Sequence, residues 1–392
     1  MPDVLTESAT VVIVGAGVAG MTAASLLRTC GIDCVVLERQ SRAYVEQRQR
    51  AGVLEYRAAQ MFGDWGLAGL LGHFPADDTL EIRVEGQSHL VLNDPDGGRP
   101  GGTLIPQQIL LRNLISAFLD DGGDLRFGAA DVAPRELAAE RPVVGYTDPA
   151  GQRHEISCSF VAGCDGEHGI TRRGVPDGVL TVHTQDYGIG WLTIQAVAPP
   201  PRYPLMAVSS RGFAAQFTRG PQASRFYLQC APDGQLADWP PDRIWTELRA
   251  RLGREDLPGG EITDREVFGL RGLVCEPMSY GRLYLLGDAA HIIPPMGGKG
   301  MNMALYDAEV FARAVRDCVQ RGDETGLRDY SAVCLRHTWT YQEFSRWMME
   351  MVHDPGQQAD PFRARLARAR LDRLLHSETA SREFGELMSG LA

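Results

Sequence analysis

The hydrophobic and polar positions at the start of the sequence follow the pattern of a strand, a helix and a second strand. Val11–Val14 is an apolar run rich in β-branched residues, which is typical of a strand buried on both faces. Met21–Cys30 contains mainly good helix formers, and Cys34–Leu37 is a second apolar run that ends at Glu38. The pattern therefore predicts a βαβ unit.

Three glycines lie at the turn between the first strand and the helix. Gly15, Gly17 and Gly20 form the pattern G-x-G-x-x-G, in which the first permits a tight turn and the second lets a pyrophosphate approach the backbone. The third lets the helix pack closely on the strand, and the helix N-terminus offers unpaired N–H groups to the phosphates. Because Glu38 follows at the right offset to accept hydrogen bonds from a ribose hydroxyl, the turn predicts a dinucleotide site.

Alternating apolar and polar residues predict an antiparallel sheet in two separate parts of the chain. Leu80–Leu92 alternates in this way, as do several runs within Thr181–Asp264, whereas the sequence from Ala304 to about Met351 is helical in pattern. We expect an α/β fold with a Rossmann-like nucleotide-binding domain, an inserted antiparallel-sheet domain for the substrate and a helical C-terminal region. The expected boundaries are 1–75, 98–180 and 268–303 for the first, 76–97 and 181–267 for the second, and 304–392 for the third.

Two further apolar strands end at a glycine beside an acid, at Asp165-Gly166 and at Gly287-Asp288. Each aspartate by itself is equally well explained as a residue that stabilises its turn. Together with the first glycine-rich turn they place three such signals at the carboxyl ends of strands, where open α/β sheets bind ligands. A long dinucleotide is needed to reach all three, and FAD fits better than NAD because Asp288 can accept hydrogen bonds from ribityl hydroxyls.

Composition narrows the class of protein. The net charge of −11 and the absence of a long basic run argue against a nucleic-acid partner. Eight cysteines are scattered without a metal or disulfide spacing. The first residues do not resemble a signal peptide, and no apolar run is long enough to span a membrane, so we expect a reduced cytoplasmic protein. The sequence leaves the oligomeric state open and allows a homodimer.

The order of these segments resembles the single-component flavoprotein aromatic hydroxylases, and among them most of all the 4-hydroxybenzoate 3-monooxygenases. The resemblance covers nearly the whole chain and implies an FAD-dependent monooxygenase that uses NADPH and O2 to hydroxylate an aromatic ring through a flavin C4a-hydroperoxide. The segments that carry it are GAGVAG at 15–20, ERQ at 38–40, RQRAGVLE at 48–55, AGCDGEHGITR at 162–172, GW at 190–191, DRIWTELRARL at 242–252, EPM at 276–278 and GDAAHIIPPMGGKGMNMA at 287–304.

The resemblance also implies which residues contact the flavin. The glycines of the segment PPMGGKGMN keep side chains away from a flat ring, and the positive end of the following helix favours the anionic reduced flavin. Pro295 is expected to present its backbone carbonyl to the substrate. The residues expected to bind FAD, besides those of the first βαβ unit and the two aspartates, are Arg50, Gln107, Gly298, Lys299, Gly300, Met301 and Asn302.

A second set of residues is expected, by the same resemblance, to bind NADPH. Arginine suits the 2′-phosphate because its planar guanidinium pairs with phosphate oxygens, although by composition alone a run of arginines is more often a solvated face. The residues implied are Arg39, Gln40, Tyr44, Arg48, His168 and Arg271, with Arg172 as a further candidate.

The substrate residues depart from the pattern of the 4-hydroxybenzoate enzymes. Arg219 and Tyr227 match the residues that hold the substrate carboxylate, so a small aromatic acid is expected. The assisting serine is replaced by Phe217, and the tyrosine that takes the phenolic proton is replaced by Met206. The other replaced positions are Asp77 for a histidine that passes the proton to solvent, Met296 for a threonine and Met388 for a second tyrosine.

These replacements remove the groups that deprotonate a phenol and leave the carboxylate-binding pair. A ring that already carries an amino group or a second hydroxyl needs such groups less, so we expect a substituted benzoate such as an amino-hydroxybenzoate. The alternatives are 4-hydroxybenzoate itself, and a larger aromatic or an oxidative decarboxylation. A flavin-bound redox sensor without turnover is a further alternative, against which the NADPH and flavin residues count.

Overall fold

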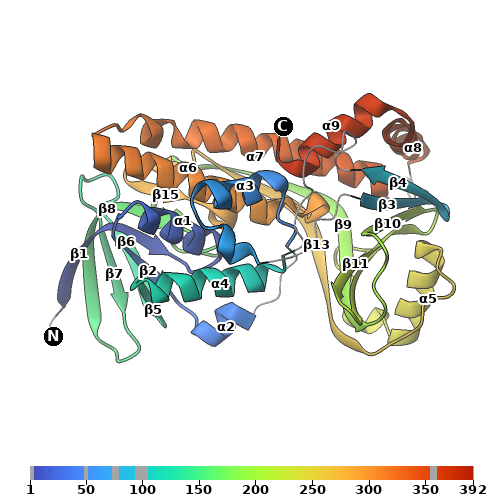
Figure 1. The fold of residues 1–392 in the computed structure, drawn as a ribbon, viewed down its shortest axis with the longest axis horizontal. Coiled ribbons are helices and arrows are strands. Elements are labelled where there is room, and N and C mark those ends of the chain that lie inside the picture. The colour runs from blue at the N-terminus through green and yellow to red at the C-terminus, as the bar shows by residue number, and fades with distance from the viewer. Residues whose placement is uncertain (1–3, 48–51, 73–78, 93–104, 354–359, 392) are drawn as a thin grey trace. The chain divides into compact units, whose positions relative to one another are not determined.

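The computed structural model describes residues 4–47, 52–72, 79–92, 105–353 and 360–391, and the chain divides into two compact units (Figure 1). The first unit comprises 1–74, 103–184 and 272–342, and the second comprises 75–102, 185–271 and 343–392. Three elements run from one unit into the other: strand β9 (Thr181–Val197), strand β13 (Ile262–Glu276) and helix α7 (Thr325–His353). Both units combine helices with a sheet, which confirms the expected α/β class.

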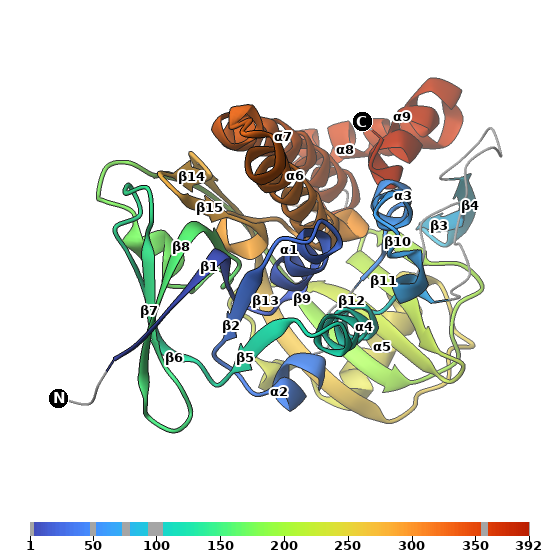
Figure 2. The same cartoon turned by 60° about the vertical axis from the view of Figure 1, so that its left-hand side comes forward.

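The first unit is built on a sheet whose central strands are parallel (Figure 2). Its strands, in spatial order, are β14 (Ser279–Tyr280), β15 (Leu283–Leu285), β8 (Arg153–Gly163), β1 (Leu5–Val14), β2 (Cys34–Glu38) and β5 (Asp124–Phe127). Strand β7 (Val143–Thr147) pairs antiparallel with β8 and carries β6 (Ala130–Arg135). The apolar run predicted as the first strand lies in β1, and Val11, Val12 and Ile13 are fully buried, as a strand covered on both faces requires.

Helix α1 (Val18–Thr29) packs against two other helices of the first unit, α4 (Gln107–Asp120) and α6 (Lys299–Arg321). Small residues of α1 such as Ala23 and Ala24 are fully buried, which lets its neighbours approach closely. The remaining elements are α2 (Arg42–Gln47), α3 (Tyr56–Asp64), β16 (His291–Ile292) and the short 3₁₀ helices η1 (Ala68–Leu71), η2 (Thr171–Gly174), η4 (Gly287–Ala289) and η5 (Met296–Gly298). None of the helices that the structure describes is long and apolar enough to cross a bilayer.

The second unit holds most of a second sheet, which is largely antiparallel. After β16 and β13 its order is β9, β12 (Ala223–Cys230), β11 (Gly212–Gly220), β10 (Leu205–Ser209), β3 (Thr79–Val84) and β4 (Gln87–Leu92). Helix α5 (Pro241–Leu252) covers one face, where Phe226 and Leu228 join Ile244 and Leu248 in one buried cluster. The unit also contains η3 (Leu236–Asp238), α8 (Pro361–His376) and α9 (Glu378–Ser389).

The strand register places three expected substrate residues on the face of this sheet that α5 does not cover. Ala215 stands opposite Met206 on one side and opposite Tyr227 on the other, and Phe217 is two residues further along β11. Because side chains alternate along a strand, Met206, Phe217 and Tyr227 share one face, while Phe226 points to α5.

The helical region at the end of the chain differs in detail from its expected form. Instead of one long region beginning at Ala304, α6 already begins at Lys299 and ends at Gly322, whose φ of 71° terminates the helix. Helix α7 follows it, and the first part of α7 belongs to the first unit whereas α8 and α9 belong to the second.

Candidate active site

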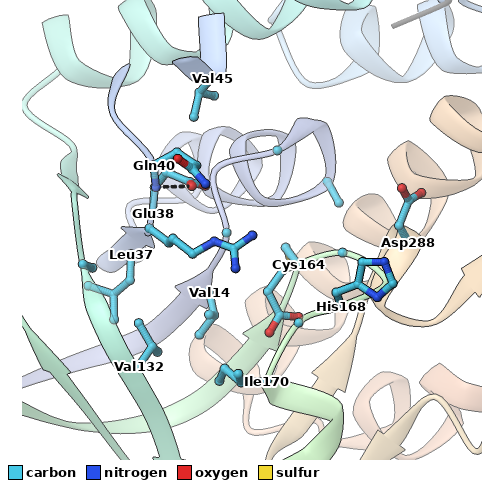
Figure 3. Close-up of a pocket in the computed structure, with 18 of the residues that line it drawn as sticks. Val14, Leu37, Glu38, Gln40, Val45, Val132, Cys164, His168, Ile170 and Asp288 are labelled. Carbon is cyan, nitrogen blue, oxygen red and sulfur yellow. Dashed lines mark hydrogen bonds between the residues drawn. The ribbon is translucent and has the colours of Figure 1, made fainter. Parts of the chain in front are cut away.

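A cavity of about 440 Å³ lies in the first unit at the carboxyl ends of β1, β2 and β8. Figure 3 shows Glu38 and Gln40 on one side of it, Asp288 and His168 on the other, and Cys164 between them. The lining thus contains residues from all three of the strand ends that the sequence singled out. This is the edge at which open α/β sheets bind ligands.

The three glycines of the first turn have three different surroundings. Gly15 has a φ of +106°, and a Cβ there would lie 2.4 Å from the carbonyl oxygen of Cys164, so only glycine fits. A Cβ on Gly20 would lie 2.0 Å from the carbonyl oxygen of Gly15, because α1 starts directly on the turn. A Cβ on Gly17 would meet no atom of the described residues within 4 Å. Gly17 therefore faces open space in the cavity wall, where a bound group can approach the backbone.

The N-terminus of α1 and the carboxylate of Glu38 offer complementary contacts to a nucleotide. Helix α1 begins after Gly17 without a side-chain cap and without an acid in its first turn, so its first N–H groups suit a phosphate. The backbone N–H groups of Ala16 and Gln40 donate to the two oxygens of Glu38, at 2.8 and 2.7 Å. These bonds hold the carboxylate in place, and its remaining lone pairs can accept from ribose hydroxyls.

Asp165 and Asp288, the two aspartates at the further strand ends, both line the cavity. The backbone N–H and the hydroxyl of Thr171 both donate to Asp165, at 2.8 and 2.7 Å, so this carboxylate stabilises its loop while it also lines the cavity. Asp288 lies in η4 at the far end of the cavity. Its position suits the polyol part of a long dinucleotide.

A buried pair beneath the Gly287–Asp288 turn holds that turn in place. Asp307 accepts from the backbone N–H of Gly287 at 2.9 Å and pairs with the imidazole of His291 at 2.7 Å. Burial by itself would lower the pKa of His291, but the charge and the hydrogen bond of Asp307 outweigh it and raise the pKa. The hydrogen bonds of Asp307 therefore tie α6 and His291 to the turn that carries Asp288.

The glycine-rich loop before α6 is anchored to the segment Gly52–Glu55. Gly297 and Gly298 have φ values of 68° and 64°, which reverse the chain at the start of α6. The side chain of Asn302 donates to the carbonyl of Val53 at 2.8 Å and accepts from the backbone N–H of Glu55 at 3.1 Å. The loop and this segment therefore form one rigid part of the first unit.

Lys299 is fully buried, at 1% exposed side chain, and pairs with the carboxylate of Glu55 at 2.7 Å. Burial lowers the pKa of Lys299, and the charge of Glu55 opposes this effect. Met296 and Met301 are buried as well, Pro295 is half-buried, and a Cβ on Gly300 would touch only Ile293. Gln107 begins α4 and lines the cavity.

The residues expected to bind NADPH are not all gathered in one place. Arg39, Gln40 and Tyr44 line the cavity beside Glu38, where Arg39 and Tyr44 are exposed. His168 lines the opposite side of the same cavity, and its side chain is 84% exposed. Arg271 is an exposed residue of β13 in the second unit.

Three expected residues, Arg48, Arg50 and Asp77, lie outside the described residues. A fourth, Arg172, is described and does not line the cavity. Arg172 donates to the carbonyl oxygens of Ala289 at 3.1 Å and of Glu167 at 2.7 Å. Its guanidinium thereby links the loop after β8 to the turn before β16, a structural role that the sequence pattern had not indicated.

The expected substrate residues of the second unit form one cluster. Burial lowers the pKa of Arg219, which is partly offset by Tyr227, whose hydroxyl lies within hydrogen-bonding reach. Tyr227 is 5% exposed and packs edge-on against Phe217, with ring centroids 5.7 Å apart. The guanidinium of Arg225 also lies over the Tyr227 ring, with its central carbon 5.4 Å from the ring centre. Among the described residues, no carboxylate forms an ion pair with Arg219 or Arg225.

Of the positions at which the sequence lacks the phenol-deprotonating groups, Met206 and Met388 lie among the described residues. Met206 is 6% exposed and lies on the same sheet face as Tyr227. Met388 lies in the last turn of α9 and is half-buried. Neither thioether can accept a proton from a phenol at neutral pH.

The cavity of the first unit fits FAD. It is open at Gly17, where the diphosphate would lie against an uncapped helix N-terminus, and Glu38 is fixed where a ribose would lie. Asp288, at the opposite end, is placed to accept from ribityl hydroxyls.

No pattern in the sequence had indicated Glu55 and Asp307 as site residues. Both are acids in otherwise apolar surroundings, Glu55 after AGVL and Asp307 within the buried face of α6. A lone acid in an apolar run is a signal of a buried partner, but the partners, Lys299 and His291, become visible only in the fold.

Known proteins resemble the chain over most of its length. The model of the FAD binding domain family matches residues 8–345. A p-hydroxybenzoate hydroxylase of Acinetobacter baylyi is 33% identical over 387 residues, which cover 97% of this chain and 95% of that protein. A probable NADH-specific resorcinol 4-hydroxylase of Rhodococcus jostii is 26% identical over 81% of this chain, which spans 61% of that protein.

Among solved structures, that of the p-nitrophenol 4-monooxygenase from Pseudomonas putida covers 99% of this chain and is itself covered completely, with a TM-score of 0.83 at 20% identity. At that identity the likeness shows the fold alone. The family match and the 33% identical relative also show the type of activity. The chain belongs to the FAD binding domain family, and it is an FAD-dependent aromatic monooxygenase of the kind to which p-hydroxybenzoate hydroxylase belongs.

Proposed function

We propose that this enzyme hydroxylates the ring of a substituted benzoate that already carries a strong electron donor, such as an amino-hydroxybenzoate, with NADPH as reductant. The observation that supports the proposal most is that Arg219 interacts with Tyr227, which shares one sheet face with Met206. The first two residues suit a carboxylate, and the third replaces a proton acceptor with a thioether.

Arg219 is suited to a substrate carboxylate because its half-buried side chain lies beside the Tyr227 hydroxyl. A guanidinium that is partly withdrawn from water without a carboxylate partner is costly, and an incoming aromatic acid would supply the missing charge. The charge-assisted bonds from Arg219 and Tyr227 would fix the acid at one end, so that the opposite part of the ring is held in a defined position.

The apolar residues beside Arg219 and Tyr227 determine which aromatic acids the enzyme can hydroxylate. Bound FAD supplies the redox chemistry that activates O2 for transfer of one oxygen atom to the ring. Met206 and Phe217 exclude water and line an adaptable, apolar surface, but they cannot draw a proton from a phenol. An amino group or a second hydroxyl on the ring supplies the electron density that a phenolate otherwise would.

A second candidate substrate is 4-hydroxybenzoate itself. The relative from Acinetobacter baylyi, whose name specifies this compound, shares 33% identity over nearly the whole chain, which favours this candidate. The replaced positions Met206 and Phe217 favour the substituted ring, so a change at Met206 tests the two candidates against each other.

The variant Met206→Tyr should raise the efficiency of the enzyme with 4-hydroxybenzoate, because it returns a hydroxyl to the sheet face that holds Tyr227. Acid–base assistance is typically worth a factor of about 100 or more in rate, so a gain of at least about tenfold in kcat/KM for hydroxylation of 4-hydroxybenzoate is expected, with more product per NADPH. Met206→Leu, which changes the shape without adding a hydroxyl, is the control. If both variants respond alike to 4-hydroxybenzoate, the missing proton acceptor does not govern substrate choice.

The variant Arg39→Ala should reduce kcat/KM for NADPH by about tenfold or more and leave that for NADH unchanged, because charge-assisted bonds to the 2′-phosphate are worth about 1.5–3 kcal/mol. Arg42→Ala is the matched control, since Arg42 pairs with Glu46 at 2.6 Å on the neighbouring helix. Because one relative is named as NADH-specific, kcat/KM has to be measured with both NADPH and NADH. A loss of FAD affinity instead would assign Arg39 to the adenosine half of the flavin.

A further inference from the structure

A histidine and a tryptophan of the second unit form a buried hydrogen bond that the chemistry described so far does not use. Trp191 of β9 donates its indole N–H to Nε2 of His353, the last residue of α7, at 2.7 Å. His353 is 0% exposed and Trp191 is 3% exposed. Both side chains are therefore fixed within the interior of the unit.

The hydrogen bonds define the proton positions on His353. An indole nitrogen can only donate, so Nε2 of His353 has to accept and carries no proton. The other ring nitrogen, Nδ1, lies 2.9 Å from the carbonyl oxygen of Met349, to which it donates. Burial lowers the pKa of His353 to about 4, so the ring is uncharged near neutral pH and Nε2 stays free to accept.

Trp191 connects this histidine to the residue that we expect to hold the substrate carboxylate. Its ring lies 4.8 Å from that of Tyr227, at an interplanar angle of 52°, and stacks on Phe213 at 5.3 Å. Phe213 also touches His353, with ring centroids 4.8 Å apart. Tyr227 packs in turn against Phe217. The aromatic rings thus form one continuous layer from His353 to the Arg219–Tyr227 pair.

Apolar packing alone does not account for this arrangement. A tryptophan can place either edge of its indole against a neighbour, and in an all-apolar core its N–H would be left unpaired. The hydrogen bond to His353 selects one orientation of the Trp191 ring. That orientation determines which part of the indole contacts Tyr227. A histidine here thus does what a leucine or phenylalanine could not.

We propose that His353 is a positioning residue for the substrate carboxylate: through its hydrogen bond it fixes the Trp191 ring against which Tyr227 rests, and so keeps the Tyr227 hydroxyl in reach of Arg219. The inference rests on the proposed function, in which Arg219 and Tyr227 bind the carboxylate of an aromatic acid. It adds that the end of α7, far along the chain from both residues, determines how well that acid binds.

The test measures equilibrium binding of 3-amino-4-hydroxybenzoate to the FAD-loaded enzyme by calorimetry. His353→Phe keeps a ring of similar size and removes the acceptor of the Trp191 N–H, so we expect the Kd to rise about five- to tenfold. His353→Gln can return an acceptor oxygen, and its Kd should stay within about twofold of the wild type. In turnover, His353→Phe should raise KM by a similar factor and change kcat by less than about twofold.

A probe without the carboxylate separates positioning from general damage to the pocket. 2-Aminophenol is the same ring without the acid group, and its weak binding should be equal in the wild type and in His353→Phe. Because Trp191→Phe removes the donor of the same bond, the double variant should bind the acid no more weakly than His353→Phe alone. Thermal unfolding of each variant checks that the fold is kept, and Trp191→Phe and His353→Gln remain informative if His353→Phe does not fold.

Two outcomes would overturn the inference. The first is that His353→Phe binds the acid as tightly as the wild type does. The second is that its affinity for 2-aminophenol falls by the same factor as its affinity for the acid. In either case His353 does not act on the carboxylate contacts. The proposed function has a separate test in Arg219→Met. If that variant keeps its affinity for the acid, the proposed function fails, whereas an effect of Arg219→Met without one of His353→Phe contradicts only the role of His353.

Discussion

Gly17→Val should abolish FAD binding and leave the fold intact. Gly17 has extended backbone angles, φ −73° and ψ −176°, that any residue adopts, and within the part of the chain that the structure describes a Cβ there meets no atom within 4 Å. The valine side chain would instead fill the space where the diphosphate approaches the backbone. We expect the affinity for FAD to fall at least about 100-fold, which corresponds to about 2.8 kcal/mol. Flavin absorbance of the purified protein and titration of the apoprotein with FAD measure this loss.

Two other glycines serve as controls for this variant. Gly63 is exposed in α3 and also has open space around it, so Gly63→Val should keep the flavin. Gly20→Ala should lower the thermal stability even without FAD, because its Cβ would collide with the carbonyl of Gly15. If Gly17→Val retains one FAD per chain, the dinucleotide does not lie along this turn.

Arg219→Met should weaken binding of the aromatic acid by roughly 100-fold. The thioether keeps much of the volume of the arginine side chain but leaves the carboxylate of the ligand without its charge partner in a half-buried place. A stranded charge of this kind costs about 3 kcal/mol or more. Binding of 3-amino-4-hydroxybenzoate and of 2-aminophenol to the FAD-loaded variant measures the effect, which should be confined to the acid.

A neighbouring arginine provides the control for this second variant. Arg243 of α5 also contacts an aromatic ring, that of Trp239 at 4.4 Å, but it lies on the helix that covers the opposite face of the sheet. Arg243→Met should therefore bind the acid like the wild type. If Arg219→Met lowers the affinity for the acid and for the aminophenol by the same factor, the arginine maintains the shape of the pocket and does not bind the carboxylate.

The parts of the fold that could be predicted from the sequence are those set by local pattern. The βαβ unit around Gly15, Gly17 and Gly20 is local, because Gly15 and Gly20 are required by atoms within the unit or of the strand directly beside it, and Gly17 lies between them in the same turn. The antiparallel sheet followed from alternation, and the register then brought Met206 and Tyr227 to one face. Neither inference needed knowledge of distant contacts.

The parts that could not be predicted depend on pairs of residues far apart in the sequence. Lys299 pairs with Glu55, 244 positions away, and Trp191 pairs with His353, 162 positions away. No spacing or periodicity relates such residues, since only the packing of complete elements brings them together. The role of Arg172 was missed for the same reason, as its partner Ala289 lies 117 positions further along the chain.

The most direct test of the proposed function is the ratio of hydroxylated product to NADPH consumed by the wild-type enzyme, compared between two acids. Without a proton acceptor at Met206, 3-amino-4-hydroxybenzoate should give a ratio near one. With 4-hydroxybenzoate the ratio should be well below one, and the remaining NADPH should appear as hydrogen peroxide. Efficient hydroxylation of 4-hydroxybenzoate, with the amino-substituted acid giving no product, would contradict the account.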